Sequence, residues 1–155
     1  MIFSIKAIAF DIDGTLYPDR QLYIRLIPYF FKNFSFFMKY AKVRKILHRT
    51  AVLPDFFEYQ ARLLADFMKI SAQEAHVLIN KNVYEGLKPY FKKVKIFPHV
   101  PQAIDSFKNA GLKLAVLSDF PPEQKGDLWG LKDKFDCILG SEKCGALKPS
   151  VYTFG

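Results

Sequence analysis

Two aspartates separated by a single residue follow a short apolar run near the N-terminus. Asp11 and Asp13 come directly after residues 5–10 (Ile-Lys-Ala-Ile-Ala-Phe), and Gly14 and Thr15 stand behind them. A short apolar run that ends at a glycine is typical of a buried strand that enters a tight turn. Because ligands bind at the carboxyl ends of the strands in open α/β sheets, this pattern predicts two carboxylates at a ligand-binding edge.

Two neighbouring carboxylates at such an edge carry a free-energy cost as well as a chemical capacity. They repel each other and lose hydration unless a cation lies nearby or one of them is protonated. Carboxylates also serve as nucleophiles and as general acids. A second interpretation is a surface turn with two solvated acids, since Asp-Gly turns are common and a motif needs its structural context.

The segment resembles motif one of the haloacid dehalogenase (HAD) superfamily of phosphatases and phosphotransferases, an apolar strand followed by Asp-x-Asp-Gly-Thr. The resemblance implies that Asp11 attacks phosphorus and becomes an aspartyl phosphate. It also implies that Asp13 protonates the leaving oxygen and later deprotonates the attacking water, which favours phosphoryl transfer over dehalogenation. Gly14 would bring the backbone close to phosphate, and Thr15 would either orient the Asp11 loop or cap the turn.

A hydroxyl follows a second apolar run, Leu-Lys-Leu-Ala-Val-Leu at residues 112–117. Ser118 ends this predicted strand, which comes after a predicted helix over residues 101–110. The arrangement resembles motif two of the same superfamily, in which a serine or threonine hydrogen-bonds a phosphate oxygen. Asp119 is interpreted first as a turn or cap residue and, as the alternative, as a substrate-binding residue.

A lysine near the C-terminus stands in Gly-Ala-Leu-Lys-Pro, behind a third predicted strand over residues 135–139. This segment resembles motif three, and the resemblance implies that Lys148 neutralises the nucleophile and the phosphoryl oxygens. A compact cation offsets the charge of two acids and a phosphate. The alternative for Lys148 is a solvated side chain before a helix-starting proline.

The resemblance also implies a Mg²⁺ cofactor, held by the Asp11 carboxylate and the Asp13 backbone carbonyl. In the superfamily, motif four supplies one or two further acids, but no acid follows Lys148 in these 155 residues. We therefore expect a C-terminally incomplete core and weak Mg²⁺ binding with several waters as ligands. An apolar first strand left at the sheet edge predicts self-association through that strand.

The remaining pattern predicts an α/β fold with an inserted helical unit. One helix is predicted from residue 22 or 28 to residue 47, and a second begins after Pro54-Asp55. Later strands alternate with helices, which indicates a parallel, Rossmann-like sheet. The predicted domains are an α/β core at 1–19 and 92–155 and an all-helical insertion at 20–91. By resemblance the insertion is a cap of the C1 type, which covers the active site and selects the substrate.

Composition bounds the remaining choices. The chain has 155 residues with a formal charge of +8, which favours anionic ligands such as phosphate esters, nucleic acid or a membrane surface. Two cysteines without a ligand spacing indicate a reducing cytoplasm. Charged residues interrupt the apolar stretch 22–37, so it is too polar to span a membrane.

The predicted function is a cytoplasmic, Mg²⁺-dependent phosphatase that acts on a small phosphomonoester through an aspartyl phosphate. The expected partner is a small phosphorylated substrate, without nucleic acid or a membrane span. Two alternatives from the same resemblance are a phosphomutase and a catalytically impaired fragment that retains phosphate binding. A basic nucleic-acid or membrane-surface binder is supported only by the charge and by the Phe- and Lys-rich insertion.

Overall fold

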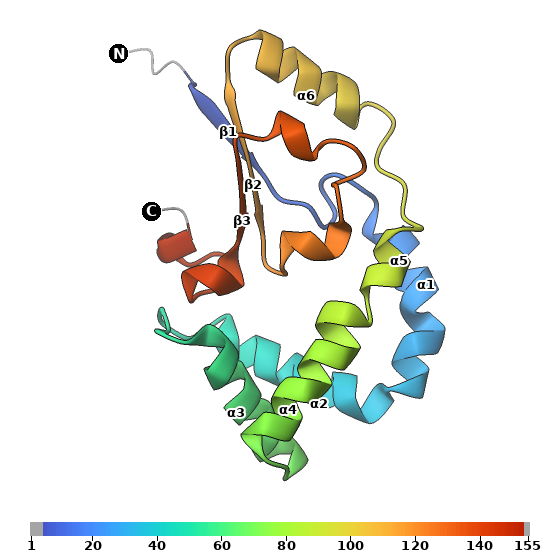
Figure 1. The fold of residues 1–155 in the computed structure, drawn as a ribbon, viewed down its shortest axis with the longest axis vertical. Coiled ribbons are helices and arrows are strands. Elements are labelled where there is room, and N and C mark those ends of the chain that lie inside the picture. The colour runs from blue at the N-terminus through green and yellow to red at the C-terminus, as the bar shows by residue number, and fades with distance from the viewer. Residues whose placement is uncertain (1–4, 154–155) are drawn as a thin grey trace.

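The computed structural model describes residues 5–153 of the chain. Three parallel strands form the sheet in this part of the chain. The strands are β1 (Ala7–Phe10), β2 (Lys113–Ser118) and β3 (Cys137–Gly140), in the order β1-β2-β3. Phe10 pairs with Val116, and Ser118 pairs with Gly140. All three strands therefore end at the same edge, which confirms the predicted parallel α/β sheet (Figure 1).

The first strand is less buried than its apolar sequence predicts. Ala7 and Ala9 are exposed, while Ile8 and Phe10 are half-buried. In the described sheet β1 pairs only with β2, and its larger side chains pack on one side, where Phe10 contacts Phe107 at 6.1 Å between ring centroids. The prediction of a buried first strand is therefore wrong, and the predicted self-association through this strand stays a prediction.

The second strand is the buried centre of the sheet. Leu114, Val116, Leu117 and Ser118 are all buried on β2. A central parallel strand is covered on both sides and has a neighbour at each edge, which explains its almost continuous apolar sequence. Helix α6 (Val100–Asn109) precedes β2 and lies beside the sheet (Figure 1).

A helical layer occupies the chain between β1 and α6 and lies below the sheet in Figure 1. Its elements are α1 (Asp19–Lys32), α2 (Phe34–Leu47), α3 (Phe56–Met68), α4 (Ala72–Ile79), the π-helical turn η1 (Asn80–Glu85) and α5 (Lys88–Phe91). The predicted helical insertion is therefore helical in the structure. No described helix is long and apolar enough to cross a membrane.

The single helix predicted to run to residue 47 is instead two helices. The chain leaves the helical conformation at Asn33, with φ −115° and ψ 28°. The Asn33 side-chain amide donates to the Tyr29 carbonyl oxygen at 3.0 Å, which competes with the regular helical bonding. The bend brings the rings of Phe30 and Phe37 to 4.5 Å, so α1 and α2 form two walls rather than one rod.

Short 3₁₀ turns complete the fold: one follows β2, one lies directly before β3, and two follow β3. They are η2 (Pro122–Lys125), η3 (Lys132–Lys134), η4 (Ser141–Cys144) and η5 (Val151–Thr153). The loop after β1 is also buried, because Ile12, Leu16 and Tyr17 are at most 1% exposed. Burial of these three side chains fixes the backbone on which the two acids stand.

The start of α3 provides a test of the assigned helix boundaries. Asp55 Oδ1 accepts a hydrogen bond from the Glu58 backbone N–H at 2.9 Å. We expect Asp55→Ala to lower the free energy of unfolding by about 1 kcal/mol, since one N-terminal amide loses its acceptor. Urea denaturation measures this change. Asp66→Ala, on the exposed side of the same helix, is the matched control and should not destabilise the protein.

Candidate active site

The predicted nucleophile and the predicted lysine meet at the carboxyl edge of the sheet. Asp11 follows β1, and Lys148 comes from the loop after η4. Lys148 Nζ donates to Asp11 Oδ1 at 2.6 Å and to the Leu117 carbonyl oxygen at 3.1 Å. The Asp11 side chain is 42% exposed, so it keeps access to a ligand while it is paired with the lysine.

Asp13 is held by three donors, two of which the sequence did not indicate. The Tyr17 hydroxyl donates to Asp13 Oδ1, while Lys125 Nζ lies 3.1 Å and Ser118 Oγ 3.4 Å from Oδ2. Lys125 also donates to Ser118 Oγ at 3.3 Å. Lys125 lies in η2, seven residues after Ser118, a position that carries no signal of its own in a single sequence.

Burial shapes the protonation of these two unpredicted donors. The Lys125 side chain is 0% exposed, and burial lowers the pKa of its ammonium group while the Asp13 charge works against that shift. Its Nζ also lies 4.8 Å from the ring centroid of Phe91. Burial, followed by the Asp13 charge, raises the pKa of Tyr17. The Tyr17 hydroxyl therefore stays a donor at neutral pH.

Gly14 and Thr15 shape the turn that follows the two acids. Gly14 has φ +79°, and a Cβ built there would lie 2.9 Å from Asp19 Oδ2, so only glycine fits without a shift. Thr15 is exposed, and its backbone N–H donates to the Ile12 carbonyl oxygen at 3.2 Å. The sequence did not indicate a role for Asp19, which is the first residue of α1. Burial, followed by the charges of Asp13 and Asp11, raises the pKa of Asp19.

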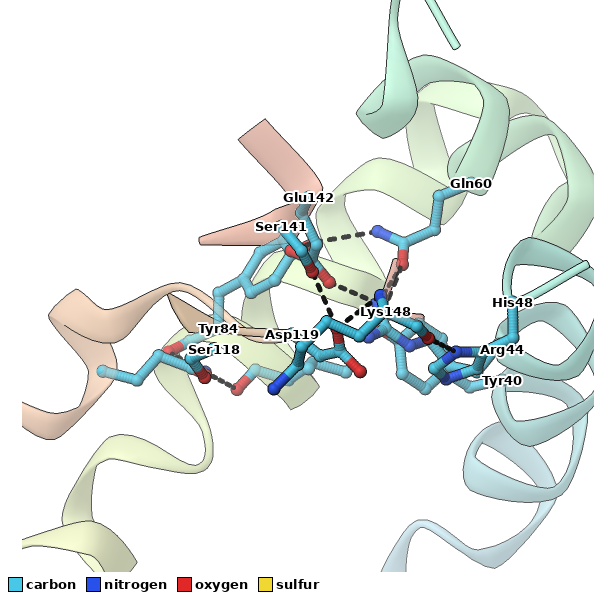
Figure 2. Close-up of polar contacts among 12 residues, drawn as sticks. Tyr40, Arg44, His48, Gln60, Tyr84, Ser118, Asp119, Ser141, Glu142 and Lys148 are labelled. Carbon is cyan, nitrogen blue, oxygen red and sulfur yellow. Dashed lines mark hydrogen bonds and ion pairs between the residues drawn. The ribbon is translucent and has the colours of Figure 1, made fainter. Parts of the chain in front are cut away.

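Asp119 holds the loop that carries the lysine. Its Oδ1 accepts from Ser141 Oγ at 2.7 Å and from the Lys148 backbone N–H at 3.0 Å. Figure 2 shows Asp119 between these two residues. These contacts favour the interpretation of Asp119 as a turn residue, although its side chain also lines the cavity described below.

A buried polar network joins the helical layer to the loop after β3 (Figure 2). Arg44 of α2 forms an ion pair with Glu142 of η4, whose side chain is 0% exposed. Tyr84 donates to the other Glu142 oxygen at 3.0 Å. Gln60 donates to the Tyr84 hydroxyl at 2.8 Å and accepts from Tyr40 at 3.0 Å. No sequence pattern indicated this network, because Arg44 and Glu142 stand 98 positions apart.

The network keeps its groups in defined protonation states. Burial raises the pKa of Tyr40 and of Tyr84, so both hydroxyls remain donors at neutral pH. Burial also raises the pKa of Glu142, and Arg44 opposes that shift. Beside the network, His48 Nδ1 donates to the Lys148 carbonyl oxygen at 3.0 Å. Helix α2 therefore contacts the loop that positions the predicted catalytic lysine.

A cavity of about 780 Å³ opens between the acids and the helical layer. Carboxylates and a lysine form one end, namely Asp11, Asp13, Asp19, Asp119 and Lys148. Side chains of α1 and α2 form much of the remaining wall. The residues predicted as nucleophile, acid–base group and lysine thus share one accessible space.

The carboxylate oxygens at this end of the cavity can hold Mg²⁺ only if substrate phosphate and waters supply its remaining ligands. The described part of the chain contains no group of three or more histidine, cysteine or acidic side chains placed to hold a metal ion. Asp11 Oδ1 accepts hydrogen bonds from Lys148 Nζ and from the Ile12 backbone N–H, while Oδ2 accepts none from a described residue. Mg²⁺ is commonly bound by one or two carboxylates, substrate phosphate and waters, and these residues fit that arrangement.

A parallel sheet with two acids and a lysine at its carboxyl edge is an arrangement that a class of enzymes can share, and it does not identify a single protein. The family model of haloacid dehalogenase-like hydrolases matches residues 5–154, and the chain belongs to this family of hydrolases. This match confirms the resemblance on which the predicted fold and enzyme class rest.

One curated relative is the phosphoglycolate phosphatase of Aquifex aeolicus (strain VF5). It is 29% identical over 159 residues, which cover 94% of this chain and 65% of that protein. The chain thus spans slightly less than two thirds of this relative's length.

Solved structures that are named as a dehalogenase and as a phosphatase have folds similar to that of this chain. An L-2-haloacid dehalogenase from Xanthobacter autotrophicus, with chloropropionic acid covalently bound, has a TM-score of 0.55 and 19% identity, covering 97% of this chain and 62% of that one. A HAD phosphatase from Thermococcus onnurineus has a TM-score of 0.54 and 21% identity, covering 97% and 68%. At these identities the likeness shows the fold and leaves the reaction to the site residues.

Removal of the Glu142 charge tests the buried network. We expect Glu142→Gln to lower the free energy of unfolding by about 3 kcal/mol or more, because Arg44 is left buried without its counter-ion. The double variant Arg44→Met/Glu142→Met should recover most of that loss. Urea denaturation of the three proteins measures both effects.

An exposed ion pair supplies the control for this experiment. Glu85 and Lys88 lie 2.7 Å apart, with side chains 56% and 39% exposed. Glu85→Gln should change the free energy of unfolding by less than about 1 kcal/mol. Equal losses for Glu85→Gln and Glu142→Gln would contradict a stabilising role of the buried pair.

Proposed function

We propose that the chain carries the active site of a Mg²⁺-dependent phosphatase that hydrolyses a phosphomonoester through an aspartyl phosphate at Asp11. The observation that supports the proposal most strongly is the pairing of Lys148 with Asp11, at 2.6 Å, next to a second acid with its own buried cation. The name of the phosphatase relative supports the same reaction. A cytoplasmic location belongs to the proposal, since Cys137 and Cys144 are free thiols.

In the first step, a carboxylate oxygen of Asp11 attacks phosphorus and the bond to the ester oxygen breaks. Asp13, in its protonated form, gives its proton to that oxygen, so the product leaves as a neutral alcohol. Lys148 offsets the negative charge that gathers on Asp11 and the phosphoryl oxygens. Bound Mg²⁺ would neutralise phosphoryl charge, with Asp11 as its ligand from the described carboxylates.

In the second step, water attacks the aspartyl phosphate and restores the Asp11 carboxylate. Asp13, now ionised, takes a proton from the water, and inorganic phosphate is released. Lys125 lies 3.1 Å from Asp13 Oδ2 and stabilises the ionised form that this step needs. Tyr17 and Ser118 donate to the same carboxylate and fix its orientation.

The helical layer over residues 20–91 is proposed as the cap, with the core at 1–19 and 92–155. Helices α1 and α2 line the cavity above the acids, while the core supplies the proposed nucleophile, acid–base group and lysine. A cap of this kind limits the access of water and selects the alcohol part of the substrate.

The second acid favours phosphoryl transfer over dehalogenation within this family. An alkoxide leaving group needs a proton, whereas a halide leaves as a stable anion without one. Asp13 stands two residues after the proposed nucleophile and is engaged by a buried cation, a suitable arrangement for proton transfer. A phosphomutase would use the same residues and pass the phosphoryl group to a second hydroxyl rather than to water.

Hydrolysis of 4-nitrophenyl phosphate tests the proposal directly. We expect Mg²⁺-dependent release of inorganic phosphate that EDTA abolishes and excess Mg²⁺ restores. Asp11→Asn should lower turnover to background, because an amide cannot form the acyl phosphate. Asp66→Asn, on the exposed face of α3, is the matched control and should retain activity. Equal rates for the Asp11 variant and the unaltered chain would overturn the assignment.

Lys125 gives a second test, of the proton-transfer group. Lys125→Met should lower kcat at least about tenfold, part of the roughly 10²–10⁴-fold that a positioned acid–base group contributes. KM should change little, because Lys125 contacts Asp13 and lies outside the cavity wall. Lys143→Met removes an exposed cation paired with Glu123 and serves as the control. A change in KM alone would argue against a role of Lys125 in positioning Asp13.

A further inference from the structure

The wall of the cavity beyond the reacting end is mainly apolar and aromatic. Its apolar and aromatic side chains come from α1, α2, η1, α5 and the loops after β1 and β2. Those that carry the argument are Leu26, Phe30, Phe37, Tyr40, Phe91 and Phe120. Such a lining gives a bound polar alcohol few hydrogen-bond partners and gives an apolar group extensive contact.

The cavity is also larger than a short phosphoester needs. Pockets of about 300–1,000 Å³ accommodate drug-sized ligands, and this one measures about 780 Å³. A phosphoryl group at Asp11 with a two-carbon alcohol would leave most of the apolar wall in contact with water. Burial of apolar surface against that wall is the favourable alternative.

Aromatic rings extend along the wall from the reacting end toward the helical layer. Phe120 follows Ser118 by two residues, so one ring of the wall begins close to the carboxyl end of β2. Phe30 and Phe37 lie across the α1–α2 bend and are only half-buried. Their remaining exposed surface faces a space that the protein itself does not fill.

The charged groups on the cavity differ between its reacting end and its wall. Arg44, the buried cation of the wall, is already paired with Glu142. Lys45 of α2 and Arg49, which lies just after that helix, also line the cavity and are exposed, so both are accessible to a ligand. The acids at the reacting end repel a carboxylate that lies near the phosphoryl group.

We propose that the substrate is a phosphomonoester of an alcohol that carries an aromatic ring, with the ring seated between α1, α2 and Phe120. This inference rests on the proposed phosphatase function for its reaction but concerns the alcohol part of the substrate. It predicts discrimination against phosphate esters of short hydroxy acids, such as the phosphoglycolate in the name of the phosphatase relative.

A matched pair of esters tests the inference without a change of leaving-group chemistry. The unaltered chain is assayed with 2-phenylethyl phosphate, ethyl phosphate and phosphoglycolate in the presence of Mg²⁺. Because the ring leaves water for the apolar wall, we expect kcat/KM to be about 10- to 100-fold higher for 2-phenylethyl phosphate than for ethyl phosphate. Equal values, or a preference for phosphoglycolate, would overturn the inference and leave the phosphatase assignment intact.

A substitution that fills the cavity locates the ring. Ala41 is an exposed α2 residue on the cavity wall, so Ala41→Trp adds volume there without removing a buried side chain. We expect the preference for 2-phenylethyl phosphate over ethyl phosphate to fall at least fivefold. Ala51→Trp, which changes an exposed residue outside the wall, should keep the preference. Equal preferences in both variants would place the ring elsewhere and overturn the assigned seat.

Binding of phosphonates separates this inference from the proposed reaction. Calorimetry with 2-phenylethylphosphonate and ethylphosphonate should give a Kd about 10- to 100-fold lower for the aromatic compound. Selective binding without hydrolysis of any ester would overturn the phosphatase proposal and support the aromatic site. Equal binding of both phosphonates, or of neither, would overturn the aromatic site.

Discussion

The balance of charge at the carboxyl ends of β1 and β2 is the constraint on which the rest of the structure depends. Two carboxylates two residues apart are stable there because each has a cation within reach. Lys148 lies 2.6 Å from Asp11, and Lys125 lies 3.1 Å from Asp13. The two pairs differ in exposure: Lys148 and Asp11 are accessible from the cavity, whereas the Lys125 side chain is fully buried. This difference suits one acid to covalent chemistry and the other to proton transfer.

The segments that follow β2 and β3 position these two lysines. Lys125 belongs to the 3₁₀ turn after β2, and its desolvation is offset by Asp13, Ser118 and the ring of Phe91. The position of Lys148 depends on Asp119. Asp119 accepts a hydrogen bond from the Lys148 backbone N–H and thereby holds the loop in place. The buried pair of Arg44 and Glu142 connects the helical layer to the turn just before that loop, so the cavity wall and the reacting end are positioned together.

The fold alone does not decide the reaction, because dehalogenases and phosphatases have structures similar to this one. The decision rests on few side chains. In the proposed reaction Asp13 provides a proton for an oxygen leaving group, and the lining of the cavity selects the alcohol. The apolar walls of α1 and α2 arise from the same aromatic residues that pack the helical layer, so packing and the proposed substrate selection depend on the same side chains.

The sequence by itself determined the parallel sheet, the helical insertion and the acid and lysine motifs, because each depends on local periodicity or on contiguous residues. It failed where partners are distant in sequence. Asn33 divided a predicted helix through a side-chain bond, and β1 is less buried than its composition suggested. No sequence pattern indicated the buried Lys125 or the Arg44–Glu142 pair. A charged residue is normally solvated, and only tertiary packing buries it beside its counter-ion. The tertiary structure alone therefore decided how the charges are paired and which space the substrate can fill.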